Sequence, residues 1–357
     1  MKNVLFSQLL NLNILLMNKI IFKIFLLAFI VVAFATSCKN DVDINDEYKE
    51  ISVVYGLLDM SETQHFVKLT KAFQTQGNVY IAAKEIDNSQ YNPSDIKMFI
   101  EVYNDNGTFI KDINLDTVMI TNKDTGDFYA PDQIVYATAK GEKLSPNYEY
   151  HLKVKNLVTG NIVEANTRLV KDFSIVKPIS LIKSIDFSSS YPKTVEWHSA
   201  ENGKLYQLTV RYFYTDVLSD GTMIPHSVDW VMPSIKSDKT DGTEKLHVQY
   251  NGYAFYDMLA ANLELPEAGM KRYSDSVQYV ITVAHEDFSI YLDVNEPSTS
   301  IVQERPAFSN ISNGIGLFSS RFNNYRPFIG LTQKSLDSLY NGSKTYMLGF
   351  EDRPLNP

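Results

Sequence analysis

Apolar and polar residues alternate through much of this sequence. In residues 148–155 each apolar side chain is followed by a polar one, and the same pattern returns in residues 163–169 and 206–214. A β-strand points successive side chains to opposite faces, so a period of two gives it one apolar face and one polar face. The pattern therefore predicts a mainly β protein built from half-buried strands.

Turn residues divide the first part of the chain into short strands. Thr159, Gly160 and Asn161 separate two alternating runs, and residues 104–107 (Asn-Asp-Asn-Gly) separate another pair. Asn and Gly adopt the positive φ angles that tight hairpin turns need. With further strands at 51–58, 65–73 and 96–102, six or seven strands are expected between residues 48 and 170. This spacing favours an antiparallel β-sandwich of the immunoglobulin or fibronectin-III type.

Residues 171–357 predict a second, mostly β domain. Residues 171–191 are expected to connect it to the first domain, and strands are predicted at 206–214 and 277–284. Residues 253–263 carry apolar side chains at helical spacing and stop before a proline, so one short helix is predicted there. The polar stretch 216–246 is expected to form a long loop or an irregular hairpin.

The amino-terminal residues 1–37 have the parts of a signal peptide. Lys19 and Lys23 precede an uncharged apolar run, which is shorter than the roughly 20 residues that a spanning helix needs. Small residues then lead to Ser37 and Cys38, the only cysteine. This junction resembles the lipobox of bacterial lipoproteins, in which cleavage between the two residues leaves a lipid-modified cysteine at the new amino terminus. The alternatives are a buried free cysteine or an uncleaved anchor.

Met17 is a second possible start of translation. Met17 directly precedes a positively charged segment, whereas residues 1–16 add only a further apolar stretch. We interpret residues 1–16 as a mis-called start.

Residues 38–47 form a predicted acidic tether. Lys39, Asp41 and Asp43 follow the cysteine and resemble the export signals of surface lipoproteins in Bacteroidota; the alternative is a solvated linker. Cleavage after Ser37 removes three lysines and no acid, which takes the formal net charge from −9 to −12. Because nucleic-acid binders concentrate Lys and Arg, this charge argues against nucleic acid as a partner.

No residue pattern in the sequence defines a catalytic centre. The six histidines lie far apart and form no metal-binding motif, so neither a metal nor another cofactor is predicted. His151 is expected on the polar face of its strand, and the run His285-Glu286-Asp287 is interpreted as a turn. The triplet Asp124-Thr125-Gly126 resembles that of aspartic proteases, but it has no second copy and no preceding apolar strand. We interpret the abundant Tyr and Phe residues mainly as core.

Two blocks resemble a family of Bacteroidota lipoproteins known as domain of unknown function 4249. Residues 53–59 (VVYGLLD) with 64–73 (QHFVKLTKAF) are similar to its first strands, and residues 308–318 (FSNISNGIGLF) are similar to its Asn-Ile-x-x-Gly-x-Gly-x-Phe signature. The resemblance implies an envelope lipoprotein, often encoded beside TonB-dependent transporters, without an established activity. In the signature, Gly314 and Gly316 are expected to allow tight backbone packing, with Ile315, Leu317 and Phe318 facing the core.

Two functions follow as expectations. The first is a lipid-anchored outer-membrane lipoprotein, periplasmic or surface-exposed, that acts as a non-catalytic binding or accessory module for a membrane partner such as a TonB-dependent transporter. The second is a surface protein that binds or processes glycans through aromatic and carboxylate side chains. The sequence favours the first and leaves the oligomeric state open.

Overall fold

The structure is a computed structural model that describes residues 50–73, 75, 79–82, 85–121, 133–296 and 307–352. The chain divides into two compact units between Tyr48 and Lys49, and all described residues belong to the second. This part is mainly β, with short helices, as the alternation predicts. Its side chains form two hydrophobic clusters.

The first cluster is enclosed by the strands before residue 170. These strands are β1 (Ser52–Leu58), β2 (Phe66–Lys71), β3 (Ile96–Asn104), β4 (Phe109–Ile120), β5 (Gln133–Ala137), β6 (Tyr148–Asn156) and β7 (Ile162–Arg168). Short helices α2 (Val79–Ala82), α3 (Ile86–Ser89) and η1 (Pro93–Asp95) connect β2 to β3.

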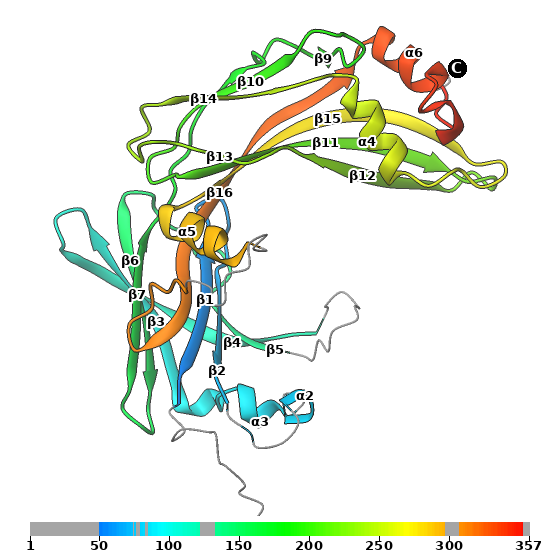
Figure 1. Cartoon of the computed structure of the whole chain (residues 1–357). Coiled ribbons are helices and arrows are strands. Elements are labelled where there is room, and N and C mark those ends of the chain that lie inside the picture. The colour runs from blue at the N-terminus through cyan, green and yellow to red at the C-terminus, as the bar shows by residue number, and fades with distance from the viewer. Residues whose placement is uncertain are drawn as a thin grey trace, which may run out of the picture. The chain divides into compact units, whose positions relative to one another are not determined.

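Strand β4 belongs to both layers of this first part. Its first half pairs with β3, from Phe109 to Leu115, and its second half pairs with β5, from Asp116 to Ile120. The sheet therefore turns back on itself at β4, and β3, β6 and β7 lie to one side of β1 and β2 (Figure 1). The alternating side chains of both layers meet in a core that includes Val54, Ile100 and Leu152.

The second cluster lies between a long sheet and a small one. The long sheet contains β11 (Leu205–Val217), β12 (Met223–Val231), β13 (Ile235–Lys236), β15 (Lys271–Ala284), β16 (Gly314–Leu331) and β9 (Ser184–Ile185). The small one contains β8 (Ile175–Lys177), β10 (Lys193–His198) and β14 (Lys245–Tyr250).

Helices complete the second part. They are α4 (Ala254–Asn262), α5 (Glu286–Asn295), α6 (Gln333–Asn341) and η2 (Tyr346–Leu348). Phe255 of α4 stacks on Phe187 with ring centroids 4.1 Å apart, and Trp197 is fully buried in the same cluster. These contacts confirm a core role for the aromatic residues that the cluster contains.

Strand β16 joins the two parts. Its first half pairs in parallel with β1, where Val54 lies opposite Gly316, and its second half pairs antiparallel with β15. The side chain of Asn310 fixes the start of this strand: its amide group donates to the carbonyl of Phe318 (2.8 Å) and accepts from the Phe318 amide (3.0 Å). Residues 308–318, which resemble the family signature, therefore place the start of β16 against the first hydrophobic cluster. Ile311 and Phe318 are buried in that cluster.

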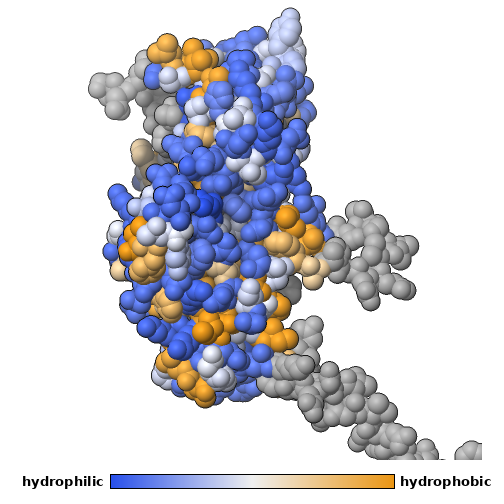
Figure 2. Space-filling model, turned by 90° about the vertical axis from the view of Figure 1, so that its left-hand side faces the viewer, coloured by the Kyte–Doolittle hydropathy of each residue, from blue (hydrophilic) through white to orange (hydrophobic). Residues whose placement is uncertain are grey.

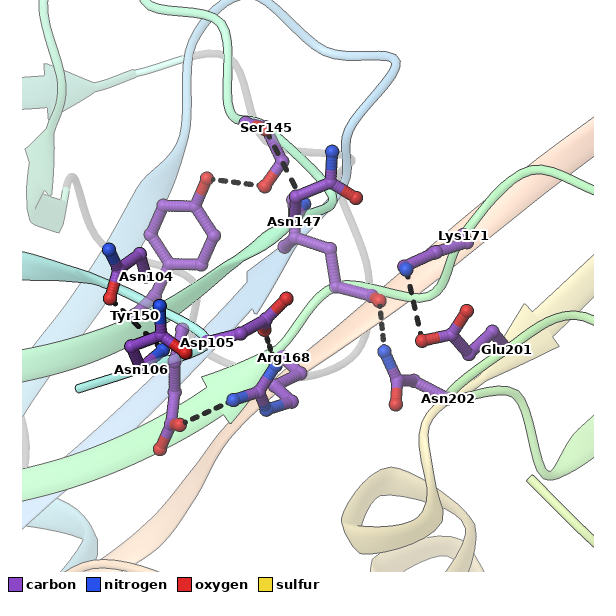
Figure 3. Close-up of polar contacts among 12 residues, drawn as sticks. Asn104, Asp105, Asn106, Ser145, Asn147, Tyr150, Arg168, Lys171, Glu201 and Asn202 are labelled. Atoms are coloured by element: carbon purple, nitrogen blue, oxygen red, sulfur yellow. Dashed lines mark hydrogen bonds and ion pairs between the residues drawn. The ribbon is translucent and has the colours of Figure 1, made fainter. Parts of the chain in front are cut away.

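Polar contacts fix the chain segment that leaves β7 (Figure 3). Arg168 pairs with Asp105 (2.6 Å) in the turn after β3, and with Glu149 (3.0 Å). Lys171 pairs with Glu201 (2.9 Å), and the nearby Asn202 side chain donates to the carbonyl of Leu169. The hydroxyl of Ser320 in β16 donates to the carbonyl of Arg168, so the crossing between the two cores is held from several sides.

The structure corrects three details of the sequence analysis. Ile315 is exposed, not buried, because it and Leu317 lie on the face of β16 opposite Phe318, and only Leu317 is covered. The run His285-Glu286-Asp287 begins helix α5 and is not a turn; the His285 ring accepts a hydrogen bond from the Asp287 amide. Helices α5 and α6 were not predicted, because the apolar residues of α5 lie on all sides of the helix and those of α6 make only a narrow stripe.

Candidate functional site

A surface pocket of about 470 Å³, with a mixed polar and apolar lining, lies where β1 ends and β2 begins. Both strands come from the blocks that resemble the lipoprotein family, and Arg321 of β16 completes the wall. The lining combines aromatic, acidic and basic side chains: Tyr55, Leu57, Asp59, Glu62, Gln64, His65, Phe66 and Arg321.

Asp59 carries an unsatisfied acceptor in this wall. The residue is buried, and its Oδ1 accepts hydrogen bonds from the amide (2.9 Å) and hydroxyl (2.6 Å) of Ser61. Its Oδ2 is buried without a hydrogen-bond partner among the described residues. A buried acceptor left unpaired costs about 1–3 kcal/mol, so the fold around Asp59 holds this oxygen at an energetic cost.

His65 is the second buried polar residue of the cavity. Its backbone exchanges hydrogen bonds with Thr138, which fixes the start of β2 against the segment after β5. Burial lowers the pKa of His65, although a hydrogen bond to the Glu142 backbone and the nearby carboxylates oppose this effect. The ring is therefore neutral at pH 7, and its Nε2 has no hydrogen-bond partner in the described part of the chain.

Aromatic rings stand at the rim of the same cavity. Tyr55 and Phe66 are exposed, and Tyr55 meets Tyr291 of α5 edge-on with centroids 6.0 Å apart. The hydrogen bond with Tyr291 and, to a smaller extent, burial raise the pKa of Tyr55 to about 12. The Tyr55 hydroxyl therefore stays protonated at neutral pH. Exposed rings beside acceptors and donors can stack on, and hydrogen-bond to, a polyhydroxylated ligand.

An apolar groove of about 490 Å³ forms a second candidate site. Tyr250 and Tyr279 lie in its lining and share a hydrogen bond of 2.6 Å between their hydroxyls. Pro178, Ile179, Ile182, Ile185 and Pro192 supply apolar lining.

Residues near the groove leave large apolar side chains in solvent. Leu181 is 80% exposed and Tyr191 is 78% exposed. The loop that carries Leu181 is held in place because Arg326 donates to the carbonyls of Ile175 and Pro178, at 2.6 and 2.5 Å. Clustered exposed apolar residues beside a groove are typical of a surface that another molecule covers.

The surface of the molecule is mostly polar in the view of Figure 2. In the view of Figure 2, the exposed face is predominantly hydrophilic, and apolar residues gather in several separate clusters. On this side of the molecule the apolar surface is therefore divided into local patches rather than one continuous face.

The residues that the sequence nominates fall into two groups. Ser37, Cys38, Lys39, Asp41 and Asp43 lie outside the described residues, as does the triplet at 124–126. His151 lies half-buried on β6 with its Nε2 3.0 Å from Glu149, which fits a side chain of the polar face.

Sequence reasoning did not single out either candidate site. In the sequence, Asp59 and His65 stand out only as members of the blocks that resemble the lipoprotein family. The pattern that could have indicated them is a polar residue directly after one apolar strand, Asp59, and another directly before the next strand, His65. The groove lies in the predicted connector, where Ile179, Leu181 and Ile182 are the signal: a linker seldom needs three aliphatic side chains.

The described residues contain neither a metal-binding cluster nor a membrane-spanning helix. Among them, no group of three or more His, Cys, Asp or Glu side chains has an arrangement that could hold a metal ion. No helix in the described ranges is both long and apolar enough to cross a membrane.

Comparison with known proteins does not place the chain in a family. No protein-family model matches it, and no curated protein matches it. A solved structure of a DUF4785 family protein from Legionella pneumophila is similar at 9% identity and a TM-score of 0.20, over 64% of this chain and 52% of that one. The chain thus spans about half the length of that protein, and the resemblance to the 4249 family stays a prediction.

Proposed function

We propose that this protein is a lipid-anchored lipoprotein of the cell envelope that binds an outer-membrane partner, such as a TonB-dependent transporter, without catalysing a reaction. The lipobox-like junction at Cys38 and the acidic residues after it support the anchor. The compact unit that begins at Lys49 follows the predicted tether directly in the sequence.

The apolar groove is the observation that carries the partner-binding role. Leu181 and Tyr191 directly adjoin the lining residues Ile182 and Pro192 in the chain and are exposed to solvent, which is unfavourable unless another surface covers them. Burying an exposed Leu side chain against a partner contributes about 1.5–3 kcal/mol to the free energy of binding. A partner with an apolar ridge or loop is therefore the expected occupant.

Leu181→Asp is expected to release the partner. The full-length protein, purified in mild detergent from its native envelope, should bring a membrane protein with it, and the variant should retain at most about a tenth, because a lost Leu contact is worth at least 1.4 kcal/mol. Leu265→Asp is the matched control, since Leu265 is also exposed but neither of its chain neighbours lines the groove, whereas Ile182 beside Leu181 does. Wild-type protein that is reproducibly isolated alone, or equal losses in both variants, would contradict the proposal.

A glycan-binding role is the second candidate, favoured by the cavity at Asp59 and His65. Hydroxyl groups of a ligand can accept from the exposed Arg321, while Tyr55 and Phe66 offer exposed rings for stacking. An array of soluble oligosaccharides tests this directly. Signals that Phe66→Ala abolishes and Phe109→Ala, at an equally exposed ring outside the cavity, leaves unchanged would support it, and an empty array would remove it.

A further inference from the structure

The turn between β6 and β7 presents apolar side chains to solvent at its tip. Val158 is 74% exposed and Leu157 is 54% exposed. Hydrogen bonds hold this conformation: Asn156 Oδ1 accepts from the amides of Val158 (3.0 Å) and Thr159 (3.1 Å), and the Leu157 amide donates to the carbonyl of Asp95 (2.7 Å). The tip is thus a fixed turn that keeps two aliphatic side chains in water.

Further apolar and basic residues surround this tip. Ile51 and Ile162 are exposed nearby, and Lys155 lies directly opposite Lys97 on the neighbouring strand, both in solvent. Acidic Glu50 and Asp95 also lie here, so the charge at this end is mixed. The surface therefore combines an apolar tip with charged residues set back from it, which is the arrangement that interfacial membrane contacts have.

The tip lies beside the start of the folded body. The Asn156 amide is 3.4 Å from the carboxylate of Glu50, the first described residue. In Figure 1 the β6–β7 turn and the beginning of β1 share the lower end of the molecule, and Figure 2 shows hydrophobic residues gathered at that end. Whatever holds the chain just before Glu50 therefore holds this tip close by.

The length of chain before Glu50 limits how far this end can stand from a lipid on Cys38. Twelve residue steps separate the two positions, and a fully extended chain covers at most about 3.3–3.6 Å per residue, or roughly 40 Å. A relaxed tether covers much less. The anchor keeps the tip at a high effective concentration near the bilayer, so even a weak apolar contact would form.

We propose that the β6–β7 turn is a second membrane contact, with Leu157 and Val158 inserted at the boundary between headgroups and acyl chains of the bilayer that holds the Cys38 lipid. This inference rests on the proposed lipid anchor. Its consequence is orientation: two points of attachment, one covalent and one through the turn, fix the end of the body that faces the membrane.

Site-specific fluorescence on the lipid-modified, mature protein tests this contact. Cys38 is the only cysteine, so once it carries lipid a Val158→Cys variant has one free thiol for a bimane label. In phosphatidylcholine vesicles the emission should shift to the blue, and most of it should be lost when the acyl chains carry bromine. Asp220→Cys, in the exposed turn between β11 and β12, is the control and should respond to neither.

The outcomes separate the inference from its premise. A lipid-modified protein whose Val158 label ignores brominated lipid would overturn the membrane contact alone, and so would a label that is shielded from water but unquenched, which indicates a protein partner. Intact mass reports the lipid on Cys38 independently. An unmodified Cys38 would contradict the proposed function and with it the premise of the second contact.

Discussion

Gly316→Ala is expected to lower the free energy of unfolding by about 3–5 kcal/mol, because two unfavourable effects add at this position. Gly316 has a φ of +123°, a conformation that residues with a Cβ rarely adopt. A Cβ there would also lie 2.0 Å from the backbone oxygen of Val54 in β1. Relieving that contact requires the parallel β1–β16 pair to separate, and that pair joins the two parts of the protein.

Gly107→Ala is the matched control for this prediction. Gly107 also has a positive φ, +73°, but a Cβ there would meet no heavy atom within 4 Å. Its cost is therefore that of the backbone conformation alone, about 1 kcal/mol. Chemical denaturation followed by tryptophan fluorescence measures both variants, since Trp197 is fully buried. Equal losses would show that the close approach of β16 to β1 contributes nothing.

Arg272→Met is expected to lower the free energy of unfolding by about 3–5 kcal/mol, because it leaves the buried carboxylate of Asp216 with only the half-exposed His226, whose Nε2 is 3.4 Å away. Arg272 and Asp216 are 4% and 6% exposed and form a two-pronged ion pair at 2.7 and 3.0 Å. The same guanidinium donates to the carbonyl of Leu348 and lies 5.6 Å from the ring centre of Phe350. Losing it therefore also loosens the carboxyl-terminal segment from the edge of β15.

Arg211→Met provides the control within the same sheet. Arg211 and Asp229 form an equally well-aligned pair at 2.7 and 2.8 Å, but both side chains are more than a third exposed. Exposed pairs contribute about 0–1 kcal/mol, so the control should stay within that range. The double variant Arg272→Met with Asp216→Leu should recover part of the loss, because no buried charge is then left unpaired. A single-variant loss below the control's would contradict this account.

Local sequence predicted several strands, because each of them carries its own burial pattern, but the stretch 216–246, expected as a loop or irregular hairpin, contains β12 in regular pairing with β11. The runs at 148–155, 163–169 and 206–214 appear as β6, β7 and β11, and the helix predicted at 253–263 appears as α4. Tight turns are equally local: Asn104 accepts hydrogen bonds from the amides of Asn106 and Thr108, as its place before a glycine turn predicts.

Burial on a given face was harder to predict, because it depends on what covers that face. Ile315 and Leu317 have the same place in the alternation of β16, yet Leu317 is buried and Ile315 is exposed. Helix α5 makes contact with β16 but was not predicted. The burial that it causes on β16 could therefore not be predicted either. The candidate cavity shares this property: Asp59 and His65 belong to the turn between two strands, but Arg321 reaches it from a strand far along the chain.

The sequence by itself determined that this chain is mainly β and where several of its strands and turns fall, and it places an apolar segment before the single cysteine. These properties are written in neighbouring residues, since alternation, turn chemistry and a lipobox-like junction are local patterns. Only the tertiary structure decided that β1 pairs in parallel with β16, that Arg272 meets Asp216, and that Leu157 and Val158 lie beside the first residue of the folded body. Pairing between distant segments depends on the shape and hydrogen-bonding groups that both present at once, and no periodicity in either segment records its partner.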